Sequence, residues 1–434
     1  MLANEQAKRI KLGVVDIDGV LRGKYVSSKK FDSASRDGLG FCDVIFGWDS
    51  ADMLYDNVKH TGWHTGYPDI QAKPDLSSKR DIPWEPGTEF YLLDLYTPDG
   101  KLLPIAPRNV LKGLVDEAHR LEFEPFFGVE FEFCFFAETP HSLREKGFRG
   151  LNSLSPGMFG YSALRTSQSA ALMSDILGQM AAFDIELEGL HTETGPGIFE
   201  AAIAVDKTLR AADKAALFKT ALKEIASRHG LIVTFMAKWN MQLPGSSGHL
   251  HQSLWDLAGE INLFTKHAVV NSYMAGILEH MHELTAIYCP TINSYKRLVP
   301  GTWAPVNSSW GRDNRTTAIR DLSSNKKTSR IELRLTGADI NPYLAISASL
   351  ASGLDGVKRK LELPSPVNNA YSELPRSLPT NLGDATATLR ASKFAAKALG
   401  AEFVDHYALT REWEWREFEK AVTTWELERY FEII

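Results

Sequence analysis

Residues 129–133 read VEFEF and run on into CFF at 134–136. Alternate side chains of a β-strand point to opposite faces, so Glu130 and Glu132 share one face and the apolar residues between them share the other. The CFF run favours a buried strand, where bare carboxylates are costly unless they are paired or bound to a metal. For this fragment alone, the alternative is a half-exposed edge strand with a solvated acidic face.

A second acidic motif, HTETGPGIFEAAI, spans residues 191–203 and places His191, Glu193 and Glu200 around a Gly-Pro-Gly turn. Two carboxylates seven residues apart across a tight turn can converge on one hard cation, which prefers oxygen ligands. Taken singly, these residues are ordinary loop acids.

A histidine pair follows in PGSSGHLHQSLWD, residues 244–256. His249 and His251 flank Leu250 in a predicted strand, so both imidazoles share one face behind a Gly/Ser loop. Three interpretations fit this fragment: two metal ligands, two phosphate contacts, or two satisfied core histidines. The fragment alone does not choose among them.

Arginines are concentrated between residues 293 and 334, in a stretch interleaved with Val, Ile and Leu: Arg297, Arg315, Arg320, Arg330 and Arg334. In RIELR, the strand period puts Glu332 on the same face as the arginines beside it. This pattern indicates a buried guanidinium cluster around a phosphate or carboxylate, because arginine binds such groups bidentately. Together with the acidic motifs it predicts a two-cation site facing a transferring phosphoryl group, with magnesium or manganese rather than zinc.

The composition excludes several other classes of protein. The 434 residues carry a net charge of −6, which disfavours a general nucleic-acid binder. The three cysteines, Cys42, Cys134 and Cys289, lie far apart without a CxxC motif, so neither a disulfide framework nor a structural zinc site is expected. No run approaches the roughly 18 apolar residues of a membrane span. We expect a cytoplasmic protein without nucleic-acid or membrane partners.

The pattern of predicted secondary structure changes near residue 104. Residues 1–103 contain short strand-like runs separated by turns, which predicts a small, mostly β module. Residues 104–434 alternate amphipathic helices with strands, and helices are predicted at roughly 167–183, 266–288 and 342–361. A further helix with an aromatic stripe is predicted over 411–434, and the stripe is expected to dock on the core or on a neighbouring subunit.

The DIDGV stretch at residues 16–20 imitates the motif of haloacid-dehalogenase phosphatases, in which one aspartate is phosphorylated and the next is the acid. The chain offers no convincing later acidic motif of the GDxxxD type. A strand-to-turn segment with two exposed acids, Asp16 and Asp18, is therefore the better interpretation.

The ordered series VEFEF, HTETGPGIFE, GSSGHLHQSL, NSYKRLVPG, RDNR and SRIELR, followed by NPYL, resembles the glutamine synthetase family over nearly the whole chain. The resemblance implies an α+β fold with an N-terminal β-grasp domain, residues 1–103, and a catalytic domain, residues 104–434, whose curved antiparallel sheet is backed by helices. It also implies a homo-oligomeric ring, a dodecamer of two hexamers, with each active site between one catalytic domain and the β-grasp domain of the neighbouring subunit.

The family's site residues carry over position by position. The metal near the acid substrate corresponds to Glu132, Glu193 and Glu200, and the metal on the ATP phosphates to Glu130, His249 and Glu332. Arg297 and Arg334 resemble the residues that hold glutamate, and Arg315, Arg320 and Arg330 those that face the γ-phosphate. Contacts to ATP correspond to His251, Ser253 and Lys327. The amine site corresponds to Tyr161 and, from the neighbouring subunit, to Asp49.

Departures from the family pattern bear on the substrates. Where glutamine synthetases read PGYEAP, this chain reads PGTWAP, so Trp303 replaces the glutamate that closes over the ammonium site. Pro244 stands in place of an asparagine that contacts glutamate, and Ile198 interrupts the second acidic motif. Tyr371 loosely resembles a loop tyrosine that bacterial members adenylylate, although an ordinary turn tyrosine is the better interpretation.

The resemblance implies an ATP-dependent ligase that joins the γ-carboxylate of glutamate to an amine through γ-glutamyl phosphate. Because of Trp303, an organic alkyl- or arylamine is expected in place of ammonia. Two alternatives stay open, namely a true glutamine synthetase that uses ammonia and a non-catalytic relative.

Overall fold

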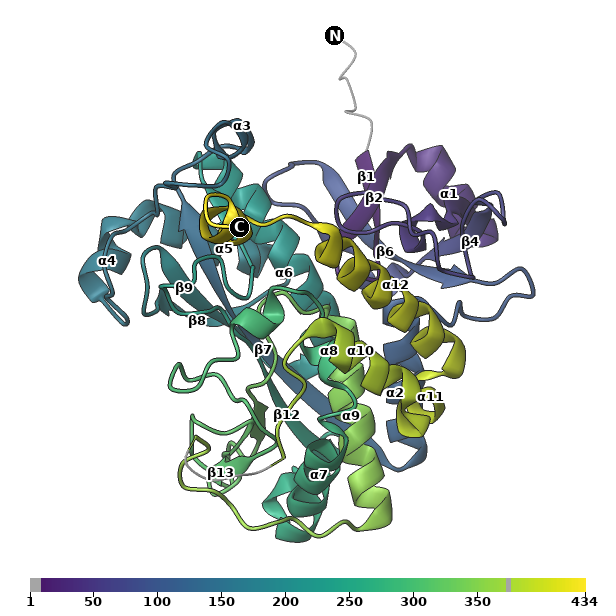
Figure 1. Cartoon of the computed structure of the whole chain (residues 1–434). Helices are drawn as coiled ribbons and strands as arrows, with labels where there is room; N and C mark the ends of the chain where they lie inside the picture. Colours follow the sequence, from purple (N-terminus) through teal and green to yellow (C-terminus); the bar gives the residue numbers. More distant parts are fainter. Residues whose placement is uncertain (1–8, 372–375) are drawn as a thin grey trace.

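The computed structural model describes residues 9–371 and 376–434, which form two β-sheets and a set of helices (Figure 1). The smaller sheet lies in the N-terminal part and has the order β2-β1-β6-β4-β3, with β5 paired to β6. Its β1–β6 pair is parallel, and the other pairs are antiparallel. Its elements are β1 (Arg9–Val15), β2 (Leu21–Val26), α1 (Ser28–Asp37), β3 (Leu39–Cys42), β4 (Asp69–Pro74), β5 (Arg80–Asp81) and β6 (Thr88–Tyr96).

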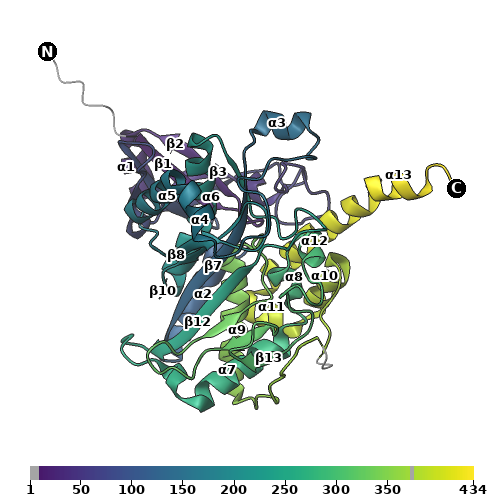
Figure 2. The ribbon, with the colours of Figure 1, turned by 90° about the vertical axis from the view of Figure 1, so that its left-hand side faces the viewer.

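The larger sheet has the order β13-β14-β15-β12-β7-β9-β8, with β10 and β11 paired to β7. All its pairs are antiparallel except β13–β14. The long strands β7 and β12 lie side by side along its middle (Figure 2). Its strands are β7 (Phe123–Phe136), β8 (Leu187–Thr192), β9 (Ile198–Ile203), β10 (Asp206–Lys207), β11 (Ile232–Thr234), β12 (Gly248–Asp256), β13 (Trp310–Arg312), β14 (Ile319–Asp321) and β15 (Ile331–Leu333).

Helices cover the apolar face of this larger sheet. The rings of Phe131 and Phe133 on β7 pack against Phe218 of α6, with centroids 6.1 and 6.0 Å apart. The opposite face carries the acidic residues. The long helices are α2 (Pro107–Arg120), α5 (Ala170–Ala182), α6 (Thr208–Arg228), α7 (His267–His280), α9 (Pro342–Arg359) and α12 (Ala401–Lys420), and the shorter ones are α3 (Pro140–Glu145), α4 (Ala163–Gln168), α8 (Thr285–Tyr288), α10 (Leu382–Ala391), α11 (Lys393–Leu399) and α13 (Thr424–Tyr430).

The predicted α+β class and the curved, largely antiparallel sheet backed by helices are confirmed. The predicted boundary between residues 103 and 104 falls in the connection between β6 and α2, and its status as a domain boundary stays a prediction. Across this connection the guanidinium of Arg108 on α2 donates to Asp94 on β6 at 2.6 Å, to Asp213 on α6 at 2.8 Å, and to Asp75 at 2.8 Å. The buried guanidinium of Arg108 therefore connects the smaller sheet to the helices that pack on the larger sheet.

Three predicted helices are interrupted, whereas the helix predicted at 342–361 is confirmed as α9, capped by Asn341. The segment 167–183 breaks at Ser169, between α4 and α5. The segment 266–288 splits into α7 and α8, and a continuous helix over 411–434 is wrong because the chain is extended at 421–423 before α13. Thr423 satisfies the free amides of α13 with a capping box, so a new helix begins there.

The DIDGV segment forms the turn between β1 and β2, and the expected exposure of Asp16 and Asp18 is wrong, because Asp16 is buried and the side chain of Asp18 is only 13% exposed. Asp16 is buried and accepts hydrogen bonds from the amides of Asp18 at 3.0 Å and Val20 at 2.9 Å, and from Arg22 at 2.8 Å. Asp18 in turn pairs with Arg411 of α12. These acids hold a turn and connect it to the C-terminal helices.

Within the described residues, no helix combines the length and the apolarity needed to cross a membrane. The cysteines are free, as expected. The aromatic stripe divides in two: Trp413 is buried against Tyr55 of the N-terminal part, while Trp425 and Phe431 are exposed at the C-terminal end.

Candidate active site

Cross-strand registry brings the predicted residues into rows on one face of the larger sheet. Glu130 and Glu132 are two residues apart on β7, so both project to the face opposite Phe131. Directly paired positions include Glu130 with His249, Glu132 with Glu200, Glu200 with His191, His251 with Glu332, and Glu332 with Arg320. Residues from six strands, some of them about 200 positions apart in the chain, are thereby neighbours.

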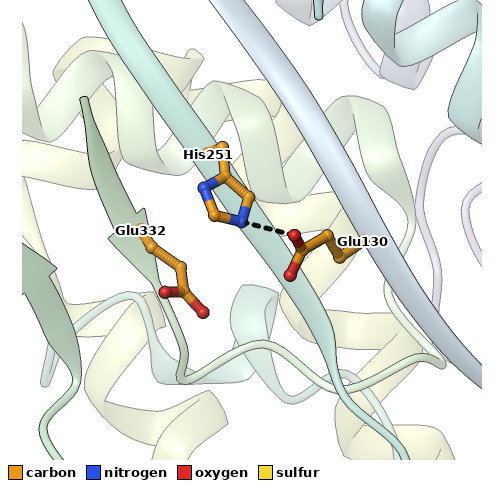
Figure 3. A group of neighbouring side chains, drawn as sticks. All are labelled: Glu130, His251 and Glu332. Carbon is orange, nitrogen blue, oxygen red and sulfur yellow. Dashed lines mark ion pairs between the residues drawn. The ribbon is translucent and has the colours of Figure 1, made fainter. Parts of the chain in front are cut away.

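Glu130, His251 and Glu332 form one group of possible metal ligands (Figure 3). Nε2 of His251 lies 3.1 Å from a carboxylate oxygen of Glu130, and Nδ1 of His249 lies 3.2 Å from one of Glu332. Burial acts to raise the pKa of Glu130, but hydrogen bonds from His249 and His251 hold that pKa well below its ordinary value. Glu130 therefore stays ionised at neutral pH.

Glu332 is the most buried acid of the site. Its oxygens accept from Arg320 at 2.9 Å and from Arg334. Against burial, His249 and Arg334 lower the pKa of Glu332 to about 2. A fully ionised carboxylate is thus held in place by two guanidinium groups.

A second group consists of His191, Glu193 and Glu200, beside Glu132. Burial raises the pKa of Glu200, and the neighbouring Glu130 and Glu132 raise it further. Burial also raises the pKa of Glu132, although the amide of Ser247 donates to its carboxylate at 2.6 Å. The carboxylates on this side of the site repel one another.

The donor set fits divalent cations. The described residues form three groups of possible ligands, and within each group the ligand atoms lie within 4.8 Å of one another; the third group combines Glu130, Glu200 and His249. Carboxylate oxygens dominate, as magnesium and manganese prefer, and a cation would relieve the repulsion at Glu200. Five of the six predicted ligands belong to these groups. Glu132 does not, but it lies directly opposite Glu200.

Two predicted glutamate-binding arginines are buried beside this row. Nε of Arg334 has no hydrogen-bond partner among the described residues, which suits it to an incoming carboxylate. Arg297 donates through Nη2 to the carbonyl of Thr336 at 2.9 Å, so it also supports the chain after β15. Their roles toward glutamate stay predictions.

The three arginines predicted to face phosphate lie in different settings. Arg330 donates from Nε to Nδ1 of His251 at 3.1 Å, and Arg320 bridges Glu332 and Asp313. Arg315 is exposed on the turn after β13. Sequence reasoning missed Asp313, although its place between two arginines in RDNR was a signal for an ion pair.

The residues predicted to contact ATP lie on two different elements, strand β12 and the loop between β14 and β15. His251 and Ser253 follow His249 along one face of β12, and Ser253 accepts from the indole of Trp255 at 3.0 Å. Lys327 is exposed in the loop between β14 and β15. Asp49 lies in the N-terminal part, where its carboxylate accepts from the amides of Ala51 and Met53, each at 2.8 Å.

The predicted amine-site residues Tyr161 and Trp303 share an unusual backbone. Their φ angles are 55° and 61°, in the left-handed region that costs non-glycine residues energy and is enriched at functional sites. The ring of Tyr161 stacks on His191 with centroids 4.4 Å apart. Trp303 is 66% exposed and, with Arg315, lines a cavity of about 560 Å³.

Arg320 connects the cavity to the acidic row, because it pairs with Asp313 in the cavity wall at 2.6 Å and with Glu332 at 2.9 Å. Burial raises the pKa of the Tyr161 phenol, Glu193 and Glu200 add to that effect, and Arg315 opposes it. The cavity is walled by Trp303, Arg312, Asp313, Asn314, Arg315, Thr316, Pro366, Val367 and Asn368. A positively charged, partly apolar cavity therefore borders the possible metal site.

Comparisons with known proteins identify the family of the chain. Residues 104–430 match the family model of the glutamine synthetase catalytic domain. The chain is 49% identical to type-1 glutamine synthetase 2 of Dictyostelium discoideum over 98% of its length and 84% of that protein's. It is 41% identical to a glutamate–isopropylamine ligase of a Pseudomonas species, covering 98% of this chain and 95% of that one.

A solved structure titled as a GmaS/ADP complex superimposes with a TM-score of 0.85 at 28% identity, covering 98% of this chain and 97% of that one. The family match and these identities extend over the strands, the acidic row and the arginines described above. The chain belongs to the glutamine synthetase family.

Proposed function

We propose that this protein is an ATP-dependent ligase that joins the γ-carboxylate of glutamate to an organic alkyl- or arylamine. The γ-carboxylate attacks the γ-phosphorus of ATP, so that ADP leaves and γ-glutamyl phosphate forms. The amine nitrogen then attacks the acyl carbon and loses a proton, the bond from carbon to the phosphate oxygen breaks, and phosphate leaves. Family membership supports the ligase activity, whereas the choice of amine is our inference.

The site's residues are assigned to these steps. Divalent magnesium or manganese, when bound, neutralises phosphate charge. Its proposed ligands are Glu130, Glu132, Glu193, Glu200, His249 and Glu332. Arg297 and Arg334 hold glutamate, Arg315, Arg320 and Arg330 stabilise the transferring phosphoryl group, and His251, Ser253 and Lys327 contact ATP. Guanidinium groups suit this task because their planar donors match phosphate oxygens.

The exposed indole of Trp303 in the wall of the cavity beside Arg315 carries the proposal of an organic amine. A carboxylate there would attract ammonium, whereas an indole offers an apolar surface worth about 0.8 kcal/mol per buried CH₂, with a cation–π contribution for a protonated amine. Arg312 and Arg315 also line the cavity, and the carboxylate of Asp313 in the same wall is already paired with Arg320, which disfavours polyamines because their second cation would meet positive charge. The similarity to a glutamate–isopropylamine ligase supports this choice.

Ammonia is the second candidate substrate. The 49% identical relative is named a glutamine synthetase. In this alternative, an acid of this chain other than residue 303 closes the ammonium site, and Trp303 only packs the loop. A non-catalytic role is disfavoured because ligating side chains occupy all six proposed metal positions, and the groups they form converge on one face.

We further propose that residues 1–103 and 104–434 are the two domains and that the protein works in the cytoplasm as a homo-oligomeric ring, a dodecamer of two hexamers. In that ring Asp49 of one subunit reaches the amine pocket of the next, beside Tyr161. Helix α13 projects from the body of the molecule and exposes Trp425 and Phe431, an apolar surface that a neighbouring copy could cover (Figure 2).

Phosphate release in the presence of ATP, glutamate and a panel of amines tests the proposal. Ammonia, isopropylamine, an arylamine, ethanolamine and a polyamine are compared as nucleophiles. We expect alkyl- or arylamines to have the highest kcat/KM, and Trp303→Glu to shift the ratio toward ammonia. Trp303→Phe, which keeps an apolar ring without adding a carboxylate, serves as the matched control and is expected to retain the preference for organic amines. An ammonia-to-amine ratio unaffected by Trp303→Glu removes Trp303 from the specificity argument.

A further inference from the structure

Tyr371 lies against the loop that carries Trp303. Its hydroxyl donates a hydrogen bond to the carbonyl of Ala304 at 3.1 Å. Burial raises the pKa of Tyr371, while Arg334 and the backbone amides of Trp303 and Gly301 act in the opposite direction. The phenol oxygen is therefore surrounded by the backbone of residues 301–304, between this loop and a buried arginine of the site.

The loop needs an external support because of its backbone conformation. Trp303 has a φ of 61° and Gly301 a φ of 80°. A non-glycine residue in the left-handed region costs about 1–3 kcal/mol and keeps that conformation only where its surroundings impose it. Within the loop, Thr302 donates from its hydroxyl to the carbonyl of Val299 at 2.7 Å. The bond from Tyr371 to Ala304 fixes the other side of the turn.

Tyr371 is itself presented from a fixed peptide. The carbonyl of the buried Ala370 accepts from the side-chain amide of Asn307 at 2.6 Å, and its amide donates to the hydroxyl of Thr316 at 3.3 Å. Asn307 follows the Trp303 loop in the chain, and Thr316 adjoins Arg315. Through its two peptide groups, Ala370 thus connects the segment after the Trp303 loop to the segment that carries Arg315.

We propose that Tyr371 is a positioning residue whose hydroxyl fixes loop 299–305, so that Trp303 stays in the cavity wall beside Arg315 and organic amines are preferred over ammonia. This inference rests on the proposed function of Trp303. The fixing of the loop, however, is measurable without any substrate. The earlier interpretation of Tyr371 as an ordinary turn tyrosine is replaced by this role.

Amide hydrogen exchange of the full chain without substrates tests the first half of the inference. Tyr371→Phe keeps the ring and removes the hydroxyl, and we expect about 5-fold faster exchange in peptides covering 299–305, the effect of one lost hydrogen bond. Tyr407→Phe is the matched control, since its hydroxyl donates to the carbonyl of Ala286 at 2.8 Å, away from this loop. Unchanged exchange of the loop in Tyr371→Phe overturns the inference.

A double-mutant cycle tests the second half. We expect Tyr371→Phe to lower the amine-to-ammonia ratio of kcat/KM about 5-fold in the wild-type background, to leave the KM for glutamate unchanged, and to have no further effect in Trp303→Glu. If Trp303→Glu lowers the amine-to-ammonia ratio of kcat/KM but Tyr371→Phe leaves it at the wild-type value, the inference is overturned. An effect confined to the KM for glutamate also overturns it, because it assigns Tyr371 to Arg334 instead.

The two proposals fail in distinguishable ways. If Trp303→Glu itself leaves the ratio unchanged, the proposed function of Trp303 fails. The exchange measurement then decides alone whether Tyr371 fixes the loop.

Discussion

Glu132 on β7 lies directly opposite Glu200 on β9, so two acids face each other across neighbouring strands of the larger sheet. Like charges at paired positions destabilise a sheet unless a counter-charge lies between them. Burial raises the pKa of both carboxyls, and neighbouring carboxylates add to the shift. This relationship is typical of a site that a divalent cation completes.

Glu132→Gln separates the metal-binding role of Glu132 from its structural role. We expect the variant to fold as stably as the wild type in excess chelator, because a neutral isostere removes repulsion. It should lose phosphate release and most of the stabilisation that magnesium or manganese gives the wild type. Thermal unfolding with and without each metal, together with a phosphate assay, measures both effects. Full activity of either protein in excess chelator contradicts the metal assignment.

Arg315→Lys is expected to lower kcat about 10²-fold while the melting temperature is unchanged. Lysine keeps the charge but loses the planar pair of donors that stabilises a developing phosphoryl charge. The side chain is exposed, so its replacement leaves packing intact. Arg312→Lys is the matched control, since Arg312 lines the same cavity. An effect limited to the KM for glutamate assigns Arg315 to substrate binding.

His280 gives the fold a pH dependence outside the site. Its imidazole contacts Glu283 at 2.5 Å and Asp355 at 2.9 Å. Burial opposes the charged form, but these two carboxylates hold the pKa of His280 above its ordinary value. The charged imidazole therefore stabilises the folded state fully below about pH 6.5, the ordinary pKa of histidine. This stabilisation is lost as the pH rises through the raised pKa of His280.

We therefore compare the free energy of unfolding of the wild type with that of His280→Asn. We expect the wild type to be the more stable protein by a larger margin at pH 6 than at pH 9. Urea denaturation at both pH values measures the difference. Arg359 pairs with Asp355 at both values, so it does not reverse the sign. A difference that is equal at the two pH values shows that the charge of His280 contributes nothing.

Arg108→Met tests the connection between the two sheets. The guanidinium is buried among Asp75, Asp94 and Asp213, and its removal leaves these carboxylates without their main counter-charge. We expect a loss of about 3–5 kcal/mol in the free energy of unfolding, typical of breaking a buried ion pair from one side. Arg120→Met, which removes an exposed pair on the same helix, should cost less than about 1 kcal/mol. Equal losses in the two variants contradict the connecting role.

The amino-acid sequence was sufficient for the strands that carry the acids. The period of two in VEFEF separated Glu130 and Glu132 from the phenylalanines, and β7 has that arrangement. Local pattern was less informative about where helices end. The break before α13 depends on Thr423 and its capping box within an otherwise helical composition, and the break at Ser169 has no strong terminating residue.

The sequence by itself determined which side chains share a face within each strand, because alternation is a property of the extended backbone. It also determined the chemistry of those side chains and the family to which the chain belongs. The tertiary structure alone decided which faces meet. Pairing of His251 with Glu332, some 80 positions away, depends on strand order and register, and contact between Tyr371 and Ala304 depends on how two loops pack. Such distances in the chain carry no local signal, since they are set by the packing of the whole sheet against its helices.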